Sequence, residues 1–237
     1  MRETKIPKYG NITMSDTETP ESIDDKTITA SPPQRTAAAQ PHVTASQMIW
    51  ERIESERTAD CRVFQVWRDR SRNPRHGGTH DFYRIEAPDW VNIVPLTSNN
   101  EVVMIEQYRH GTGEVTLEIP GGMVDDGESP SDAAARELLE ETGYAPREVV
   151  RLGRARPNPA LQTNWIYSFL ARDVQLTKAP CFDATEHATV RLVPLAEIPG
   201  LIADGTISHA LVVVGFYWLS LYERGVIPVG GPVVDGR

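Results

Sequence analysis

The sequence has only two cysteines in 237 residues, Cys61 and Cys181. They are too few and too far apart in the chain for a disulfide framework or a zinc knuckle. We expect both to be reduced residues that pack inside a cytoplasmic protein, because disulfides persist mainly in oxidising compartments.

Long apolar runs and basic charge are also scarce. The longest apolar run, 210–222, contains Gly215 and Ser220 and is too short to span a bilayer, which takes about 20 residues. It predicts a buried helix or a dimer contact and no membrane partner. The first 40 residues lack the apolar core of a signal peptide. A net charge of −9 argues against nucleic-acid binding, which needs a basic surface.

The two ends of the chain differ in composition from its middle. Residues 1–44 are rich in Thr, Ser, Pro and Ala and have few aromatics, so they cannot bury enough apolar surface to offset the entropy of ordering. We expect this segment to be disordered, with Met14 as an alternative start of translation. We expect residues 228–237 to form a flexible tail. One domain is expected over 45–227, with its N-terminal strands in 45–90.

Apolar runs bounded by turn residues predict the strands of this domain. We expect a turn at 73–78 and a final helix capped by Ser208. The expected strands are 61–69, 82–85, 91–96, 102–105, 149–152, 165–170 and 189–195, and a short helix is expected at 198–202.

The segment 121–144, GGMVDDGESPSDAAARELLEETGY, is the most informative part of the sequence. Ser129 followed by Pro130 predicts a helix start, and Gly143 predicts its end. On this helix three carboxylates crowd one face, and Arg136 offsets only part of their repulsion. The three are Glu137, Glu140 and Glu141.

A lone E-x-x-E-E pattern is usually a solvated helix face. Here Gly122, Glu128 and Arg136 precede the three glutamates at defined spacings. Their presence favours a metal site over a solvated helix face. Clustered hard oxygen ligands suit Mg²⁺, with Mn²⁺ as the alternative.

The full pattern, G-x5-E-x7-R-E-L-x-E-E-x-G, resembles the Nudix box and is complete at every position. The resemblance implies an α/β fold, a Nudix α/β/α sandwich with a mixed β-sheet. It also implies that Glu137 and Glu141 are the principal metal ligands, with help from Glu140 and the backbone carbonyl of Gly121. Arg136 would then orient the glutamates, and Glu128 would brace the loop.

The flanks of the box, E-Q-Y-R at 106–109, L-E-I-P-G-G at 117–122 and Pro159, are similar to the Nudix branch that cleaves ADP-ribose and nucleoside-diphosphate sugars. Arg109 offers a two-point fork for a diphosphate, although a surface ion pair is the alternative. Glu118 could hold a ribose or sugar hydroxyl. Asn164, in the loop after Pro159, is a further candidate for substrate binding.

The same resemblance implies a homodimer with an intertwined N-terminal region, and Trp50 is the candidate for stacking on the nucleobase. Around Pro159 the chain has Asn-Pro-Ala where the best-known members of the branch have Ser-Pro-Gly. This departure leaves the nucleoside and the sugar open.

The catalytic base is expected on the loop before the last strand, at Glu186, with Asp183 and Glu140 as alternatives. An exposed loop acid without a role is the other interpretation of Glu186. No histidine has a metal-ligand spacing such as H-E-x-x-H, so we expect no catalytic role for His110 or His187.

The sequence therefore predicts a metal-dependent hydrolase of the diphosphate bond in ADP-ribose or a nucleoside-diphosphate sugar. The products would be a nucleoside monophosphate and a sugar phosphate. A nucleoside triphosphate pyrophosphatase is the alternative among enzymes. A non-catalytic nucleotide-sensing regulator is less favoured, because such proteins tend to lose box glutamates.

Overall fold

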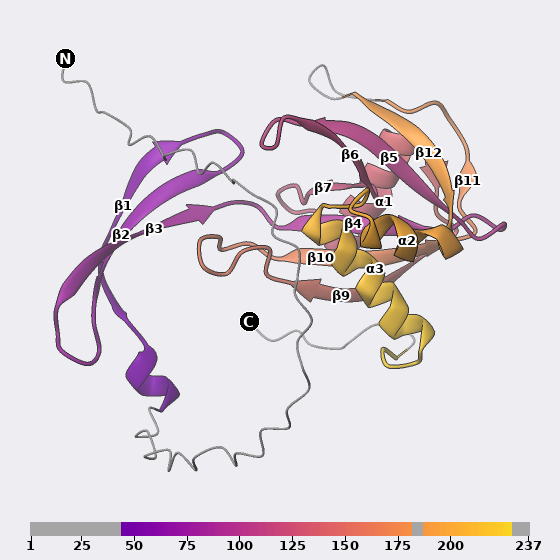
Figure 1. The fold of residues 1–237 in the computed structure, drawn as a ribbon. Helices are drawn as coiled ribbons and strands as arrows, with labels where there is room; N and C mark the ends of the chain where they lie inside the picture. The colour runs from indigo at the N-terminus through magenta and orange to yellow at the C-terminus, as the bar shows by residue number, and fades with distance from the viewer. Residues whose placement is uncertain (1–43, 182–186, 229–237) are drawn as a thin grey trace, which may run out of the picture. The chain divides into compact units, whose positions relative to one another are not determined.

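The computed structural model describes residues 44–181 and 187–228. The expectations for 1–43 and 229–237, and those for Asp183 and Glu186, lie outside the described residues. The helices and strands are arranged as Figure 1 shows. Their bounds are η1 Ala45–Met48, β1 Glu51–Asp60, β2 Gln65–Arg72, β3 Thr79–Glu86, β4 Trp90–Pro95, β5 Glu101–Arg109, β6 Glu114–Glu118, β7 Gly121–Met123, α1 Pro130–Thr142, β8 Tyr144–Ala145, β9 Glu148–Ala155, β10 Ile166–Arg172, β11 Gln175–Leu176, β12 Ala188–Pro194, η2 Leu195–Glu197, α2 Ile198–Ala203 and α3 Ala210–Glu223.

The N-terminal part of the described chain is an antiparallel sheet in the order β1-β2-β3. The expected turn at 73–78 is confirmed: the backbone N–H of Asn73 donates to the carbonyl of Gly78 at 2.7 Å. The expected strand start at Cys61 is wrong, because Cys61 lies in the turn between β1 and β2. The strand β1 was not expected from the sequence, and all ten of its residues are exposed.

The central sheet has the order β7-β4-β10-β9. β10 runs parallel to β4, whereas the other two pairings in this sheet are antiparallel. A second, antiparallel sheet has the order β12-β5-β6. The expected mixed β-sheet is therefore confirmed.

Two apolar cores lie on opposite faces of the central sheet, since neighbouring residues of a strand point to opposite faces. Val91 and Ile93 of β4 pack with Leu138 of α1, whereas Val94 packs with Phe216 and Leu219 of α3. The sheet thus lies between the two helices (Figure 1). The expected α/β/α sandwich is confirmed.

The ends of α1 are those that its sequence predicts. The side chain of Ser129 accepts a hydrogen bond from the backbone N–H of Asp132, Pro130 is the first helical residue, and Gly143 adopts the left-handed conformation with φ 77°. At α3 the prediction is wrong, because the N-cap is His209 and not Ser208. The His209 side chain makes no capping hydrogen bond.

The apolar helices and the two cysteines were both subjects of predictions from the composition. No helix within 44–181 and 187–228 has the length and apolar character needed to cross a membrane. Cys61 and Cys181 are both exposed free thiols, so the expectation that they pack in the interior is wrong.

Candidate active site

Arg136 of α1 connects the loop of the 121–144 segment to its helix. Its Nε and Nη2 donate to the two oxygens of Glu128 at 3.0 and 2.9 Å. Its Nη1 donates to Glu137 at 3.0 Å and to Glu140 at 3.2 Å. The hydrogen bonds from Arg136 hold the pKa of the Glu128 carboxyl below its usual range. Arg136 thus contacts Glu128 of the loop and two glutamates of the helix at once.

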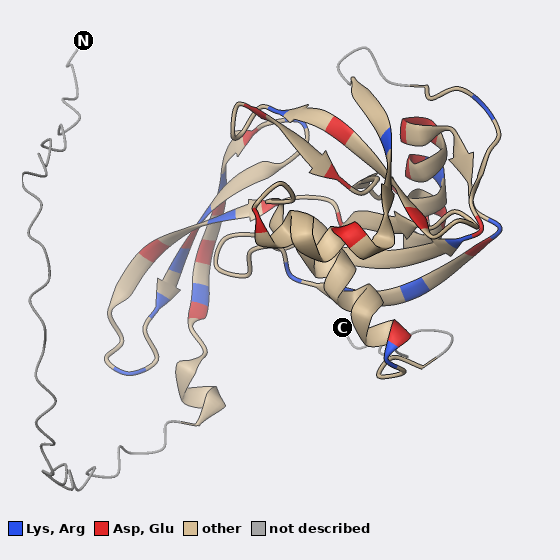
Figure 2. Ribbon diagram, turned by 45° about the vertical axis from the view of Figure 1, so that its right-hand side comes forward, with Lys and Arg blue, Asp and Glu red and all other residues tan. Residues whose placement is uncertain are grey.

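The three box glutamates differ in exposure. Glu141 is buried and accepts a hydrogen bond from the backbone N–H of Gly121 at 2.9 Å. The side chain of Glu137 is 15% exposed and that of Glu140 is 45% exposed. Figure 2 shows acidic residues along α1. α1 therefore presents one carboxylate that is hydrogen-bonded to β7 and two that Arg136 holds.

The two glycines that begin the segment let β7 approach both β4 and the Glu137 side chain of α1 closely. A Cβ at Gly122 would collide with the carboxylate of Glu137, and a Cβ at Gly121 would collide with the backbone of Val91. A larger residue at Gly121 would push β7 away from β4, and one at Gly122 would displace the carboxylate of Glu137. The glycines are therefore required by the space between β4, β7 and α1.

The donors present are of the type that a hard divalent cation prefers, namely carboxylate and carbonyl oxygens. Within the described residues, however, no three acidic, histidine or cysteine side chains converge on a point where a metal ion would fit. Arg136 holds Glu137 and Glu140, and Gly121 holds Glu141. Rotation of these side chains is therefore needed before three of them can meet one cation.

A second charged group joins the ends of β5 and β6. Arg109 donates from Nε and Nη2 to the two oxygens of Glu118 at 2.7 and 2.6 Å. Thr116 Oγ1 and His209 Nδ1 complete the contacts of this carboxylate at 2.6 and 2.8 Å. Burial alone would raise the pKa of Glu118, but the hydrogen bonds from Arg109, His209 and Thr116 outweigh it and lower the pKa to about 2.

Arg109 lies on the face of β5 that α1 covers. Val103 packs with Leu138 of α1, and every second residue along a strand points to the same face. Gln107 and Arg109 therefore share the face of Val103. This alternation brings the Arg109–Glu118 pair to the side of the sheet where the box glutamates lie.

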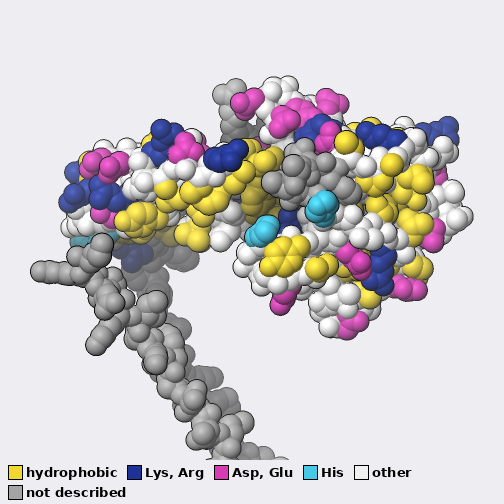
Figure 3. All heavy atoms as spheres, turned by 90° about the horizontal axis from the view of Figure 1, so that it is seen from above, with side chains coloured by type: hydrophobic (Ala, Val, Ile, Leu, Met, Phe, Trp, Pro, Cys, Tyr) yellow, Lys and Arg dark blue, Asp and Glu magenta, His cyan; other side chains and the backbone are white. Residues whose placement is uncertain are grey.

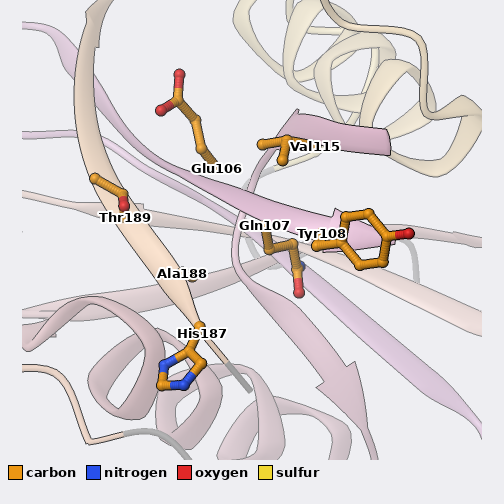
Figure 4. Close-up of a pocket in the computed structure, with 7 residues that line it drawn as sticks. All are labelled: Glu106, Gln107, Tyr108, Val115, His187, Ala188 and Thr189. Atoms are coloured by element: carbon orange, nitrogen blue, oxygen red, sulfur yellow. The ribbon is translucent and has the colours of Figure 1, made fainter. Parts of the chain in front are cut away.

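A surface pocket of about 410 Å³ opens beside this part of β5. Residues 106–108 of β5, Val115 of β6 and residues 187–189 at the start of β12 line it. Figure 4 shows Gln107 and His187 on one side of the sheet and Glu106 on the other. The pocket therefore lies beside the end of β5 that carries Arg109, although Arg109 does not line it.

Comparison with known proteins decides the family, since the model of the NUDIX domain matches residues 88–213, more than half of the chain. The chain belongs to the Nudix family. The matched residues include the whole segment 121–144.

An ADP-ribose pyrophosphatase of Mycobacterium tuberculosis is 30% identical over 168 residues, which cover 70% of this chain and 81% of that protein. A CMP-5'-(N-acetyl-N-hydroxy-3-aminopropyl)phosphonate hydrolase of Streptomyces rubellomurinus is 33% identical over 129 residues, which cover 54% of this chain and 62% of that relative. The crystal structure of an ADP compounds hydrolase matches with a TM-score of 0.67 and 24% identity, over 75% of this chain and 95% of that one. This last likeness shows the Nudix fold.

Two further residues, Trp50 and Asn164, were expected to bind substrate, and they differ in exposure. Trp50 is 37% exposed and makes edge-to-face contacts with Phe82 and His80. Asn164 is 2% exposed, and neither of its amide atoms has a hydrogen-bond partner within the described part of the chain. The roles of both in substrate binding stay predictions, and Glu186 lies outside the described residues.

Two residues that contact Glu118, Thr116 and His209, were not predicted from the sequence. Thr116 is two positions away on β6, where strand alternation could have indicated it. His209 is 91 residues away, at the start of α3, and no local pattern in the sequence connects it to Glu118. Only the packing of α3 in the tertiary structure brings it there.

Proposed function

We propose that this Nudix protein hydrolyses the diphosphate bond of ADP-ribose or of a nucleoside-diphosphate sugar. The products are a nucleoside monophosphate and a sugar phosphate. The names of its relatives support this substrate class, because the similar Mycobacterium tuberculosis protein is an ADP-ribose pyrophosphatase.

The observation that carries the proposal is the two-point pair of Arg109 and Glu118 on the α1 face of β5. The Glu118 side chain is 2% exposed, whereas that of Arg109 is 42% exposed. A guanidinium held in this way reaches solvent in a fixed plane, which suits the oxygens of a diphosphate. Because two donors already contact each oxygen of Glu118, we assign it to holding Arg109 rather than to the sugar contact expected from the sequence.

Nudix hydrolases generally use divalent cations, and we propose Mg²⁺ here, with Mn²⁺ as the alternative. Glu137, Glu140, Glu141 and the carbonyl of Gly121 would hold it, since they supply the oxygen donors it prefers. When bound, such an ion neutralises phosphate charge and lowers the pKa of a bound water. Arg136 keeps the glutamates oriented, and Glu186 is our candidate for the group that accepts a proton from water.

The proposed substrate contacts include Trp50 on the nucleobase and Asn164. We also propose that the protein is a homodimer.

Apolar side chains are exposed on the β1–β3 sheet, among them Ile53 at 46%, Phe82 at 46% and Tyr83 at 58%. Figure 3 shows apolar side chains on the surface of this sheet. A second copy of the chain would cover them, and such patches favour protein contacts. The two exposed free thiols support a reducing compartment such as the cytoplasm.

A panel of substrates tests the proposed function. Purified protein with Mg²⁺ is incubated with ADP-ribose, ADP- and GDP-linked sugars, dinucleotides and nucleoside triphosphates, and phosphomonoesters are measured with a coupled phosphatase. We expect kcat/KM for the best diphosphate sugar to exceed that for any triphosphate at least about 100-fold, a difference of about 3 kcal/mol. A preference for triphosphates would favour the pyrophosphatase alternative. No turnover of any compound would favour the nucleotide-sensing regulator.

A further inference from the structure

The carboxylate of Glu118 has two donors on each oxygen. Oε1 accepts from Arg109 Nε at 2.7 Å and from Thr116 Oγ1 at 2.6 Å. Oε2 accepts from Arg109 Nη2 at 2.6 Å and from His209 Nδ1 at 2.8 Å. Because the carboxylate is ionised, it accepts in each bond, so Nδ1 carries the proton of the His209 ring. Arg109 thus uses one contact on each oxygen, and Thr116 and His209 use the others.

His209 comes to this carboxylate from the start of α3. As the N-cap it has an extended backbone, with φ −70° and ψ 115°, and its own carbonyl accepts from the N–H groups of Val212 and Val213. An N-cap side chain usually accepts a hydrogen bond from the first turn, but the ring of His209 does not. It is directed to Glu118 instead. A role limited to capping the helix is therefore not supported.

The first turn of α3 is itself fixed to the central sheet. Asn92 of β4 donates from Nδ2 to the carbonyl of Leu211 at 2.9 Å, and Gly215 lies close to both Asn92 and Ile119. Asn92 also pairs with Gly121 of the Nudix box through the backbone. The position of the His209 ring is therefore set by a helix that packs against the strand beside the box.

We propose that His209 is a positioning residue, which sets the plane of the Arg109 guanidinium through the carboxylate of Glu118. The inference rests on the proposed function, in which Arg109 binds the diphosphate. Without the ring, Oε2 has one donor instead of two, and the side of the carboxylate facing α3 is no longer fixed. The carboxylate can then rotate, and the guanidinium that shares both of its oxygens rotates with it.

The expected effect is on substrate binding. A hydrogen bond to a buried charged group stabilises by an amount that corresponds to about 10- to 100-fold in an equilibrium constant. Arg109 is proposed to bind the diphosphate in the ground state and in the transition state alike, so its misplacement raises KM more than it lowers kcat. We expect His209→Phe to raise KM for the best diphosphate substrate about 10-fold and to change kcat less than about threefold.

Two substitutions separate the hydrogen bond from the shape of the ring. His209→Asn places an amide N–H near the position of Nδ1 and should restore KM to within about threefold of the wild type, because the donor to Glu118 returns. His209→Gln places its amide nearer the position of Nε2 and should behave like His209→Phe. The Gln variant also keeps the test available if the Phe variant does not fold. Equal KM values for the Asn and Gln variants, when both are folded, would overturn the proposal.

A double-mutant cycle tests whether His209 acts through Arg109. In an Arg109→Lys background, which lacks the two-point fork, His209→Phe should change KM less than about twofold. A full additional 10-fold increase there would contradict the proposed route. Tyr217→Ala, at a 61% exposed position of the same helix, is the matched control and should leave KM unchanged.

A measurement on the protein without substrate separates this inference from the proposed function. The side-chain Nε–H signal of Arg109 is observed by NMR and assigned by its loss in Arg109→Lys. We expect the signal to shift and broaden in His209→Phe and to return in His209→Asn. An unchanged signal in the Phe variant would overturn the inference even if the enzyme hydrolyses diphosphates. Conversely, absence of turnover with the expected NMR change would overturn only the proposed function.

Discussion

Arg109 and Glu118 form a two-point ion pair in which Nε and Nη2 lie 2.7 and 2.6 Å from the two carboxylate oxygens. The pair joins the neighbouring strands β5 and β6. It also joins a buried carboxylate to a side chain that is 42% exposed. The burial of Glu118 gives the arginine a fixed direction, which a surface pair between two mobile side chains would not.

Replacement of Arg109 by lysine tests the importance of the fork. Lysine keeps the positive charge but cannot donate to both oxygens of Glu118 in one plane. We expect KM for the diphosphate substrate to rise at least about 10-fold, as measured by initial rates over a range of substrate concentrations.

The matched control is Arg191→Lys. Arg191 also pairs with a glutamate, Glu106, at 3.1 Å, but both side chains are substantially exposed. Exposed pairs contribute little to stability or to local order, so KM should change less than about twofold. Equal effects of the two lysine substitutions would mean that the fork of Arg109 has no special role.

The pH dependence of stability tests the environment of Glu118. Its pKa in the folded protein is about 2, below the ordinary value of 4.5. A lowered folded-state pKa contributes stability that is present above about pH 4.5 and is lost as the pH falls toward 2. The difference corresponds to at most about 3 kcal/mol.

Glu118→Gln removes this contribution. We therefore expect the variant to be less stable than the wild type at pH 7, and the gap to narrow as the pH falls from about 5 to about 3. Denaturant unfolding at a series of pH values measures it. A gap that stays constant over this range would show that the ionisation of Glu118 does not stabilise the fold.

The glutamates of the box are tested by Glu137→Gln and Glu141→Gln. Each substitution keeps the shape of the side chain and removes the charge that we expect to hold the cation. We expect kcat at saturating Mg²⁺ to fall at least about 100-fold. Thermal unfolding should show that the folded state is retained, since the amide oxygen introduced by Glu141→Gln can still accept from the backbone N–H of Gly121. Near-normal turnover in either variant would remove that residue from the proposed metal site.

The catalytic base is tested at Glu186, which lies outside the described residues. We expect Glu186→Gln to lower kcat at neutral pH much more than it changes KM, because a general base acts in the transition state. Asp183→Asn is the matched control and should have a smaller effect. Wild-type turnover of the Glu186 variant across about pH 6 to 9 would leave Glu140, Asp183 or a metal-bound hydroxide as the base.

The helix of the Nudix box could be predicted from the sequence because its determinants are local. Ser129, Pro130 and Gly143 set its ends through contacts within a few residues, and the spacing of the glutamates fixes which of them share a face. Arg136 contacts Glu137 and Glu140 for the same reason. A pattern of this kind needs no knowledge of tertiary structure.

The strand β1 could not be predicted, because its residues have no buried face to create an alternating pattern. All ten are exposed, and ion pairs across to β2 accompany the backbone pairing. They join Glu51 to Arg72 at 2.9 Å and Glu56 to Arg68 at 2.6 Å. Such charges occur in turns and helices as well as in strands, so the sequence does not indicate a strand here.

The surroundings of Arg109 were beyond prediction for a different reason. The sequence indicated Arg109 and Glu118 as separate substrate contacts, but the structure pairs them and adds His209 from α3. The pairing depends on the register of β5 and β6 and on the packing of α3. Neither is encoded in any short segment of the chain.

Hydrolysis of the diphosphate bond is tested by identifying the products of ADP-ribose cleavage in ¹⁸O-labelled water with Mg²⁺ present. We expect AMP and ribose 5-phosphate to appear in equal amounts, one of them to carry a single ¹⁸O atom, and no inorganic phosphate to be released. The rate should be lost in Glu137→Gln. Release of inorganic phosphate or pyrophosphate, or no cleavage of ADP-ribose or any nucleoside-diphosphate sugar while triphosphates are cleaved, would contradict it.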